Sequence, residues 1–304
     1  ILGLCARIAF LRVVYDRLSS LLLRIDMRPR LLVVVALAFG PAASVAQDVE
    51  MLGDRYGTEP PAAYYQALSG DPGAFRFAHG RPARMRAQMA AVGNTGPGPL
   101  RILGPREGPV TGTYRIPVVT GLFADSPEGA DLAHSITEVQ AAYFGANPGT
   151  ITDFYSEISG GRVTLEGDVQ DWTKASFTRA QATGGNSGLS SGTTGAFILQ
   201  LVIRLKDVDW GLYDNDGPDG MPNSGDDDGF VDALAVIHPT AGAECGGLDK
   251  DDRIWSHRWS LRFAAGQAFT TTVPAASGGF ITIDDYLIQP LFACNEVDLS
   301  EIGV

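Results

Sequence analysis

The residues with the clearest chemistry form an acidic segment at positions 207–232. This segment contains nine aspartates and neither lysine nor arginine. Glycines are interleaved with the later carboxylates, at Gly217, Gly220, Gly225 and Gly229. Clustered carboxylates on a tightly curved backbone suit a hard cation with several oxygen ligands, such as Ca²⁺, whereas Zn²⁺ favours His and Cys. The segment therefore predicts a calcium site.

Six of these aspartates are our candidates for calcium ligands: Asp214, Asp216, Asp219, Asp226, Asp228 and Asp232. Their spacing is not that of an EF-hand, because the twelfth position counted from Asp214 is Gly225 and from Asp226 is Ile237, where that motif requires Glu. An irregular calcium site is one interpretation. A solvated acidic loop that binds no ion is the other.

The four histidines give no clear metal or catalytic pattern. His238 ends an apolar run and His257 lies in a Trp-rich stretch, and neither has a second His at metal-ligand spacing. Each could have a functional role or could be a core histidine bonded to the backbone. His79 and His134 are weaker candidates. Because the sequence has no Cys near a His and no phosphate-binding loop, cysteine-based catalysis and nucleotide binding have no support.

An export signal is expected at residues 27–46. Met27 is followed by Arg28 and Arg30, an apolar run at 31–39 and the small residues that end at Ala46. The run is about half the ~20 residues that span a bilayer, so we expect a secreted protein without a permanent membrane anchor. Residues 1–26 would be upstream leader. The net charge of −12 disfavours nucleic acid as a partner.

Export also bears on the cysteines. If Cys5 is removed with the leader, Cys245 and Cys294 remain as a pair in an oxidising compartment. A disulfide between them is the simplest expectation, and two free thiols are the alternative. The bond would close a loop of 49 residues (294 − 245).

Two regions follow the signal. Residues 47–112 are rich in Pro, Gly, Ala and Arg, which predicts little regular structure and indicates a propeptide-like or flexible region, or simply a disordered linker. Residues 113–304 have the apolar patterns of a folded domain. Strands are expected at 114–123, near a sheet edge because of Pro117, and at 162–169, 230–238 and 280–288, and helices at 132–144, 147–158 and 197–205. This order predicts an α/β or α+β domain with a mixed sheet.

Several motifs within 113–304 resemble the immune inhibitor A family of secreted bacterial metallopeptidases. They are RIPVV at 115–119, ITDFYSEISGG at 151–161, GDVQDW at 167–172, YDNDG at 213–217 with DGFVD at 228–232, and IWSHRW at 254–259. The resemblance implies a zincin-like fold, protein or peptide substrates and a zinc cofactor. An insertion between Gly217 and Asp228 lengthens the acidic segment relative to the compact form of the family.

The resemblance also implies what should come next. In this family a helix that begins like residues 301–304 continues into HExxHxxG, whose two His bind zinc and whose Glu activates the metal-bound water. Asp298 and Glu301 have the spacing of a helix-capping pair. We therefore expect a front part of the enzyme with an incomplete fold, no catalytic residues or zinc ligands of its own, and no activity. The strand at 280–288 would border the substrate cleft and pair with an extended peptide.

Two other functions fit the same residues. One is a non-catalytic secreted module for calcium binding or adhesion, which the acidic segment and the signal would suit equally well. The other is a degenerate protease that keeps the fold without the ligands. The order of the family-like motifs favours the peptidase over both.

Overall fold

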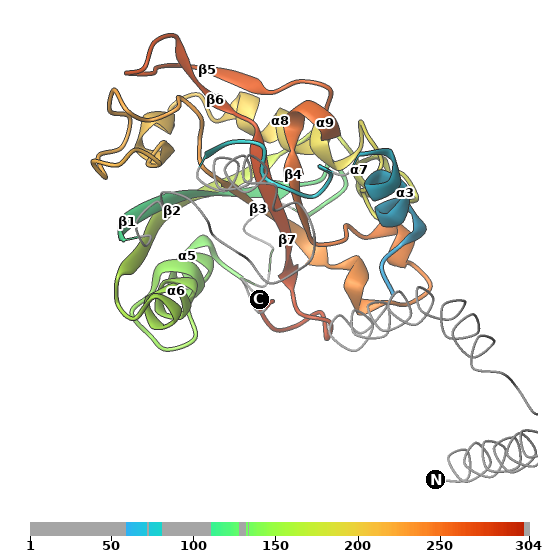
Figure 1. The fold of residues 1–304 in the computed structure, drawn as a ribbon. Helices are drawn as coiled ribbons and strands as arrows, with labels where there is room; N and C mark the ends of the chain where they lie inside the picture. Colours follow the sequence, from blue (N-terminus) through green and yellow to red (C-terminus); the bar gives the residue numbers. More distant parts are fainter. Residues whose placement is uncertain (1–58, 72, 81–110, 128–131, 133, 301–304) are drawn as a thin grey trace, which may run out of the picture. The chain divides into compact units, whose positions relative to one another are not determined.

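The computed structural model describes residues 59–71, 73–80, 111–127, 132 and 134–300 (Figure 1). The expected leader at 1–26, the signal at 27–46 and the helix start at 301–304 lie outside the described residues. The helices are α3 (Ala62–Gly70), α5 (Ile136–Phe144), α6 (Ile151–Ser159), α7 (Arg179–Thr183), α8 (Thr194–Arg204) and α9 (Leu261–Ala264). The strands are β1 (Gly112–Leu122), β2 (Val163–Lys174), β3 (Leu234–Ala241), β4 (His257–Ser260), β5 (Phe269–Pro274), β6 (Phe280–Ile283) and β7 (Asp285–Phe292).

Five strands form one mixed sheet in the order β2-β1-β3-β7-β4. The first four are parallel, and β4 runs antiparallel to β7 at the edge. Strands β5 and β6 form a separate hairpin. The predicted α/β fold with a mixed sheet is therefore confirmed.

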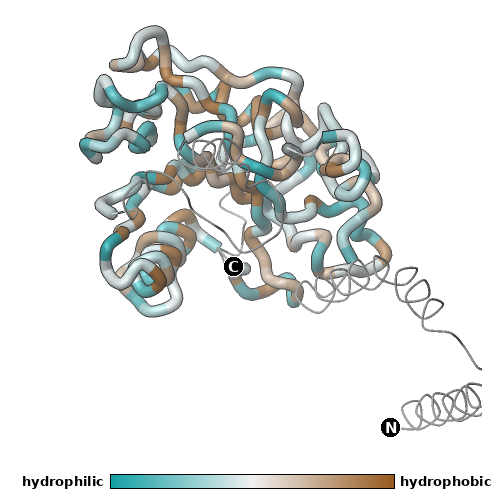
Figure 2. Tube along the Cα trace, viewed as in Figure 1, coloured by the Kyte–Doolittle hydropathy of each residue, from teal (hydrophilic) through white to brown (hydrophobic). Residues whose placement is uncertain are grey.

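The sheet is covered on both faces, which explains the nearly continuous apolar runs of its strands. Val119 and Val236 point to the face covered by α8, and their neighbours Val118 and Ile237 point to the face covered by α5. Figure 2 shows apolar residues concentrated along these strands, between the helices of the two faces. The core therefore consists of two layers separated by the sheet.

Local signals explain where the helices begin and end. Ser135 and Glu138 form a capping box at the start of α5. Thr150 caps α6 by accepting the Asp153 N–H, and Gly160 ends that helix at a φ of 65°, which glycine adopts without strain. In each helix a side chain of the preceding residue thus accepts one of the backbone amides that the first turn leaves free.

Strand β1 lies inside the sheet, so the prediction that Pro117 places it near an edge is wrong. Pro117 aligns with Asp168 of β2, and the pairing of β1 with β3 begins one residue later, at Val118. A proline lacks the N–H that a ladder on both sides would require. The strand accommodates it because β3 does not pair with β1 at that position.

The apolar stretch at 280–288 is two strands rather than one. Asp284 separates β6 from β7, and its backbone carbonyl accepts the Leu261 N–H. Because β7 has β3 on one side and β4 on the other, it has no free edge for a peptide, so the expectation that this stretch pairs with substrate is wrong for β7. The edge strand next to it is β4.

Part of the Pro- and Gly-rich region is ordered, contrary to the expectation of little regular structure. Within 59–80, α3 follows Pro61, and its Tyr64 ring stacks on Phe75 with 4.5 Å between the centroids. Ala74 and Phe75 are buried in the main core. Composition alone missed this because tertiary packing stabilises the helix.

The expected disulfide is confirmed. Cys245 and Cys294 are bonded, with their Cα atoms 5.1 Å apart. The bond ties the turn after β3 to the segment after β7.

Candidate metal centre

The acidic segment is held in place at both of its ends. Trp210 and Tyr213, in a short 3₁₀ helix (Trp210–Tyr213) before the carboxylates, are buried in the core. At the other end the Asp232 N–H donates to the Tyr213 carbonyl at 3.0 Å, and the Val231 N–H donates to the carbonyl of Thr282 in β6 at 2.9 Å. The bond between Asp232 and Tyr213 therefore holds the start and the end of the loop next to each other.

Three of the six candidate aspartates come together in this loop. Asp214, Asp216 and Asp228 each offer a carboxylate oxygen, and these oxygens lie within 4.8 Å of one another. Asp214 and Asp216 are buried, while Asp228 is exposed. Asp214 Oδ2 accepts the Gly229 N–H at 3.0 Å, whereas Asp214 Oδ1 is buried with no hydrogen-bond partner among the described residues. A buried carboxylate oxygen without a donor is costly unless a cation binds it.

The raised pKa values of the loop aspartates also favour a bound cation. Burial, together with the nearby charges of Asp227, Asp228 and Asp232, raises the pKa of Asp214 to about 8. Burial likewise raises the pKa of Asp232 to about 7, although hydrogen bonds from Asn215 oppose the shift. Without a counter-ion the folded loop therefore opposes ionisation of its own carboxylates.

The other candidates lie around this group in different roles. Asp232 borders it, and its Oδ2 accepts the Asn215 N–H at 2.9 Å. Asp219 and Asp226 are exposed and accept hydrogen bonds from the Ser224 hydroxyl. Asp227, which sequence reasoning did not select, is buried and accepts the Ser224 N–H at 2.7 Å. A run of three aspartates at 226–228 gives no sequence signal for which member faces inward.

His238 and His257 are core residues in the structure. Burial lowers the pKa of His238 to about 3 and that of His257 to about 4. His257 is hydrogen-bonded through Nδ1 to the Trp255 carbonyl at 2.7 Å and through Nε2 to the Tyr286 hydroxyl at 3.0 Å. Both are therefore neutral at physiological pH. Of the two readings left open by the sequence, these contacts favour the core histidine.

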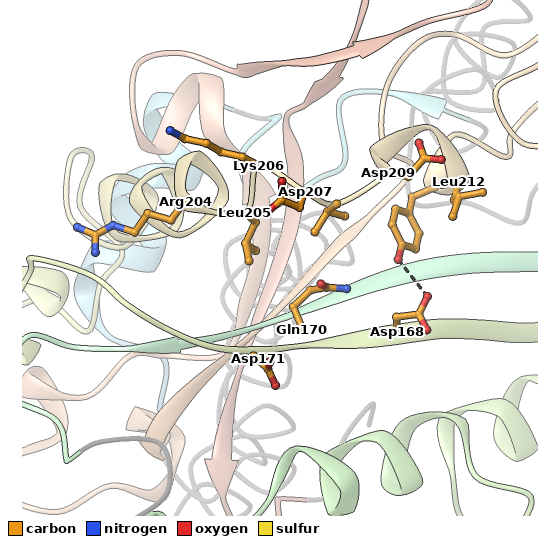
Figure 3. A pocket seen from close by; sticks show the side chains of 11 residues that line it. Asp168, Gln170, Asp171, Arg204, Leu205, Lys206, Asp207, Asp209 and Leu212 are labelled. Atoms are coloured by element: carbon orange, nitrogen blue, oxygen red, sulfur yellow. Dashed lines mark hydrogen bonds between the residues drawn. The ribbon is translucent and has the colours of Figure 1, made fainter.

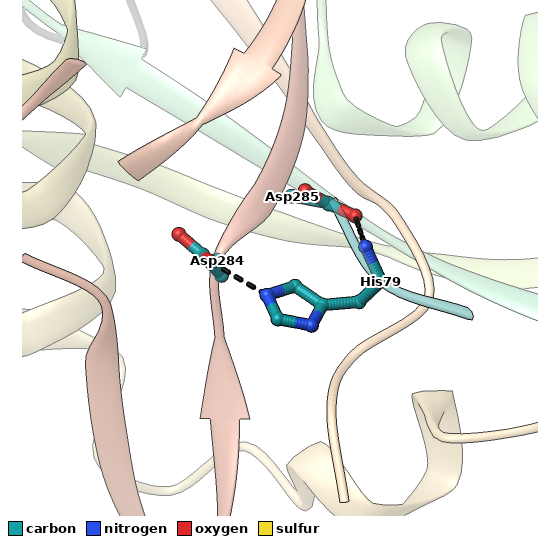
Figure 4. Close-up of side chains that lie close together, drawn as sticks. All are labelled: His79, Asp284 and Asp285. Atoms are coloured by element: carbon teal, nitrogen blue, oxygen red, sulfur yellow. Dashed lines mark hydrogen bonds and ion pairs between the residues drawn. The ribbon is translucent and has the colours of Figure 1, made fainter. Parts of the chain in front are cut away.

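The sequence analysis did not identify a second group of potential metal ligands. His79 lies beside Asp284 and Asp285, and one ligand atom from each lies within 4.8 Å of the others (Figure 4). His79 Nε2 is 2.7 Å from Asp284 Oδ2, and the Arg262 guanidinium is 3.2 Å from the same oxygen. An imidazole and a guanidinium thus already face the buried Asp284 carboxylate. His79 and Asp284 are 205 positions apart in the sequence, which explains why spacing could not reveal this group.

A polar cavity of about 410 Å³ lies between β2 and the segment after α8 (Figure 3). Four aspartates and two basic residues line it: Asp168, Asp171, Asp207, Asp209, Arg204 and Lys206. The Tyr213 hydroxyl donates to Asp168 Oδ2 at 3.3 Å, which is the dashed line in Figure 3. Because charges of both signs line this cavity, it has no clear preference for a cation.

Comparison with known proteins finds one family. Residues 135–303, more than half of the chain, match the sequence model of the immune inhibitor A peptidase M6 catalytic domain. The chain is 27% identical over 168 residues to the pre-pro-metalloprotease PrtV of Vibrio cholerae serotype O1, an alignment that covers 52% of this chain and 18% of that protein. It is 33% identical over 168 residues to immune inhibitor A of Bacillus thuringiensis subsp. alesti, covering 51% of this chain and 24% of that protein.

Proposed function

Because this chain belongs to the immune inhibitor A peptidase family, we propose that it is the front part of a secreted, calcium-stabilised zinc metalloendopeptidase. The match of residues 135–303 to the catalytic domain carries the proposal. The mixed α/β fold agrees with a zincin-like peptidase domain. Since the chain spans 18% and 24% of the two relatives described above, activity and substrates are proposed for the intact protein.

The residues of this chain do not fit a catalytic zinc site. The sequence has no HExxH, and the only His-containing ligand group among the described residues, around His79, has Arg262 beside its Asp284 carboxylate. A guanidinium at that place repels a divalent cation. We therefore propose that the zinc ligands and the catalytic Glu are encoded after Val304 and that the chain without them is inactive.

The aspartate group fits calcium. Asp214, Asp216 and Asp228 would supply oxygen ligands, and Asp232 lies close enough to add its charge. Hard oxygen donors on a Gly-rich loop are the ligands that Ca²⁺ prefers. The role that we propose is structural, because the ion would tie the start of the loop to its end and thereby place β3 relative to the 3₁₀ helix before the loop.

The domain plan is proposed as residues 1–26 upstream leader, 27–46 signal peptide, 47–112 propeptide-like region and 113–304 front of the catalytic domain. The name of the Vibrio relative, a pre-pro-metalloprotease, supports a presequence and a prosequence ahead of such a domain. Within the part of the chain that the structure describes, no helix has both the length and the apolar character needed to cross a membrane. The proposed substrates are proteins or peptides.

The proposed activity can be tested with the protein extended through the residues that follow Val304 in its gene. The extended protein should hydrolyse a denatured protein substrate, lose this activity with a zinc chelator and regain it with added zinc. The chain that ends at Val304 is the matched control and should be inactive. Folded extended protein that binds calcium but hydrolyses no substrate would overturn the proposal and favour a non-catalytic calcium-binding module or a degenerate protease.

A further inference from the structure

Residues 74–80 are bound to the rest of the domain in an unusual way. Three successive backbone amides, those of Ala78, His79 and Gly80, donate to side-chain carboxylates rather than to a neighbouring strand. The Ala78 and His79 N–H groups donate to the two oxygens of Asp285 at 2.7 and 2.8 Å, and the Gly80 N–H donates to Asp228 Oδ2 at 3.1 Å. Hydrogen bonds to an ionised acceptor are about twice as strong as neutral ones.

The carboxylates that receive this segment are built into the fold. Asp284 and Asp285 are both 0% exposed and lie at the junction of β6 and β7. Burying two adjacent carboxylates is costly unless each has charged or hydrogen-bonding partners. For Asp285 the amides of residues 78 and 79 are such partners, so the domain depends on this segment to satisfy the carboxylate.

The imidazole of His79 fits a specific place. One face of the ring stacks on Phe230, with 3.7 Å between the centroids and 9° between the planes. Its Nε2 lies 2.7 Å from Asp284 Oδ2, as Figure 4 shows. A ring that is flat, aromatic and able to donate from its far nitrogen satisfies both contacts at once. An aliphatic or anionic side chain would satisfy neither.

A second anchor lies four residues earlier in the segment. Phe75 is 8% exposed and packs on Trp259 of β4 with 4.9 Å between the centroids. The Phe75 carbonyl accepts the Arg258 Nε–H at 3.1 Å. The domain would therefore recognise two side chains of a bound peptide, an aromatic ring and an imidazole. It would also accept hydrogen bonds from the peptide's backbone amides next to the imidazole.

We propose that the domain carries a binding site for a peptide that turns at an aromatic residue and has a histidine four residues later, formed by Asp284, Asp285, Phe230 and Trp259 with a contribution from Asp228. Residues 74–80 are its occupant in this chain. The site recognises these residues through their own contacts, so it holds them after the chain is cut between positions 81 and 110. This property does not depend on whether the intact protein hydrolyses peptides.

The test is to cut the chain and ask whether the two parts separate. A recognition site for a sequence-specific protease is inserted in the glycine-rich stretch at 93–98, and the cut protein is passed over a size-exclusion column under native conditions. The part that contains residues 59–80 should elute with the rest of the domain. In the cut protein, a synthetic peptide of residues 73–80 in excess should displace it, and the same peptide with His79→Ala should be at least about tenfold weaker, as expected for loss of a hydrogen bond to a charged group.

The matched control is the peptide with Arg76→Ala, because Arg76 is exposed within the same segment. It should compete as well as the unchanged peptide. These competitions use one cut protein, so no result depends on the folding of a variant. Separation of the two parts from a domain that keeps its near-ultraviolet circular dichroism would overturn the proposal. Equal competition by the His79→Ala and unchanged peptides would overturn it too.

Discussion

Calcium at a thousand times its Kd is expected to raise the free energy of unfolding by about 4 kcal/mol, because an ion that binds only the folded state stabilises it by mass action. The proposed binding group is the set of oxygens from Asp214, Asp216 and Asp228. Asp214→Asn should abolish most of this gain, since Asp214 has a buried oxygen with no other partner among the described residues. Urea denaturation with calcium and with a calcium chelator measures the gain in each protein.

The gain should also depend on pH. In the ion-free fold the pKa of Asp214 is about 8 and that of Asp232 about 7, both above the ordinary value of 3.8. The folded state thus holds protons that the unfolded state has released, so the ion-free protein loses stability as pH rises from about 4 to about 8. Calcium binds the ionised carboxylates. Its stabilising effect should therefore be larger at pH 8 than at pH 5.

Asp219→Asn is the matched control, because Asp219 lies in the same loop but is exposed and outside the group of three. It should keep nearly the full calcium response. A response to calcium that is as large in Asp214→Asn as in the unchanged chain would show that the ion binds elsewhere. No response in the unchanged chain would leave the acidic loop as a solvated one.

The second large effect concerns the disulfide between Cys245 and Cys294. It closes a loop of 49 residues, for which the chain-entropy model gives about 4 kcal/mol of stabilisation. Reduction, or replacement of both residues by Ser, should lower the free energy of unfolding by about that amount. Urea denaturation with and without reductant measures it.

The double variant Cys245→Ser, Cys294→Ser also serves as the control for the reductant. Once both cysteines are replaced, the reductant should have no further effect on the urea midpoint. A midpoint that is the same in the oxidised, reduced and double-variant proteins would contradict the prediction.

The sheet and its helices could be predicted because their signals are local. The apolar runs of β1 and β3 and the capping residues Ser135 and Thr150 depend on near neighbours in sequence. The position of β1 inside the sheet could not be predicted, because it depends on where the pairing with β3 begins. Helix α3 was missed for a similar reason, since the Phe75 ring that packs on it lies outside the helix.

The sequence predicted which segment holds the candidate metal centre, but not how its carboxylates are arranged in space. Composition selected the acidic loop, and three of the six aspartates do meet there. Which three meet depends on the turns between Gly217 and Gly229, and the aspartates there do not follow a fixed ligand spacing such as that of an EF-hand. The contact of His79 with Asp284 depends on tertiary structure alone, because the two residues are far apart in the sequence.

Whether this chain is the front of a zinc peptidase can be read from the coding sequence that follows Val304. If it is, HExxH should appear within about ten residues, because this spacing puts two His on one helical face with a Glu beside the metal. A stop codon, or a helix without those His, would rule out the proposed zinc peptidase.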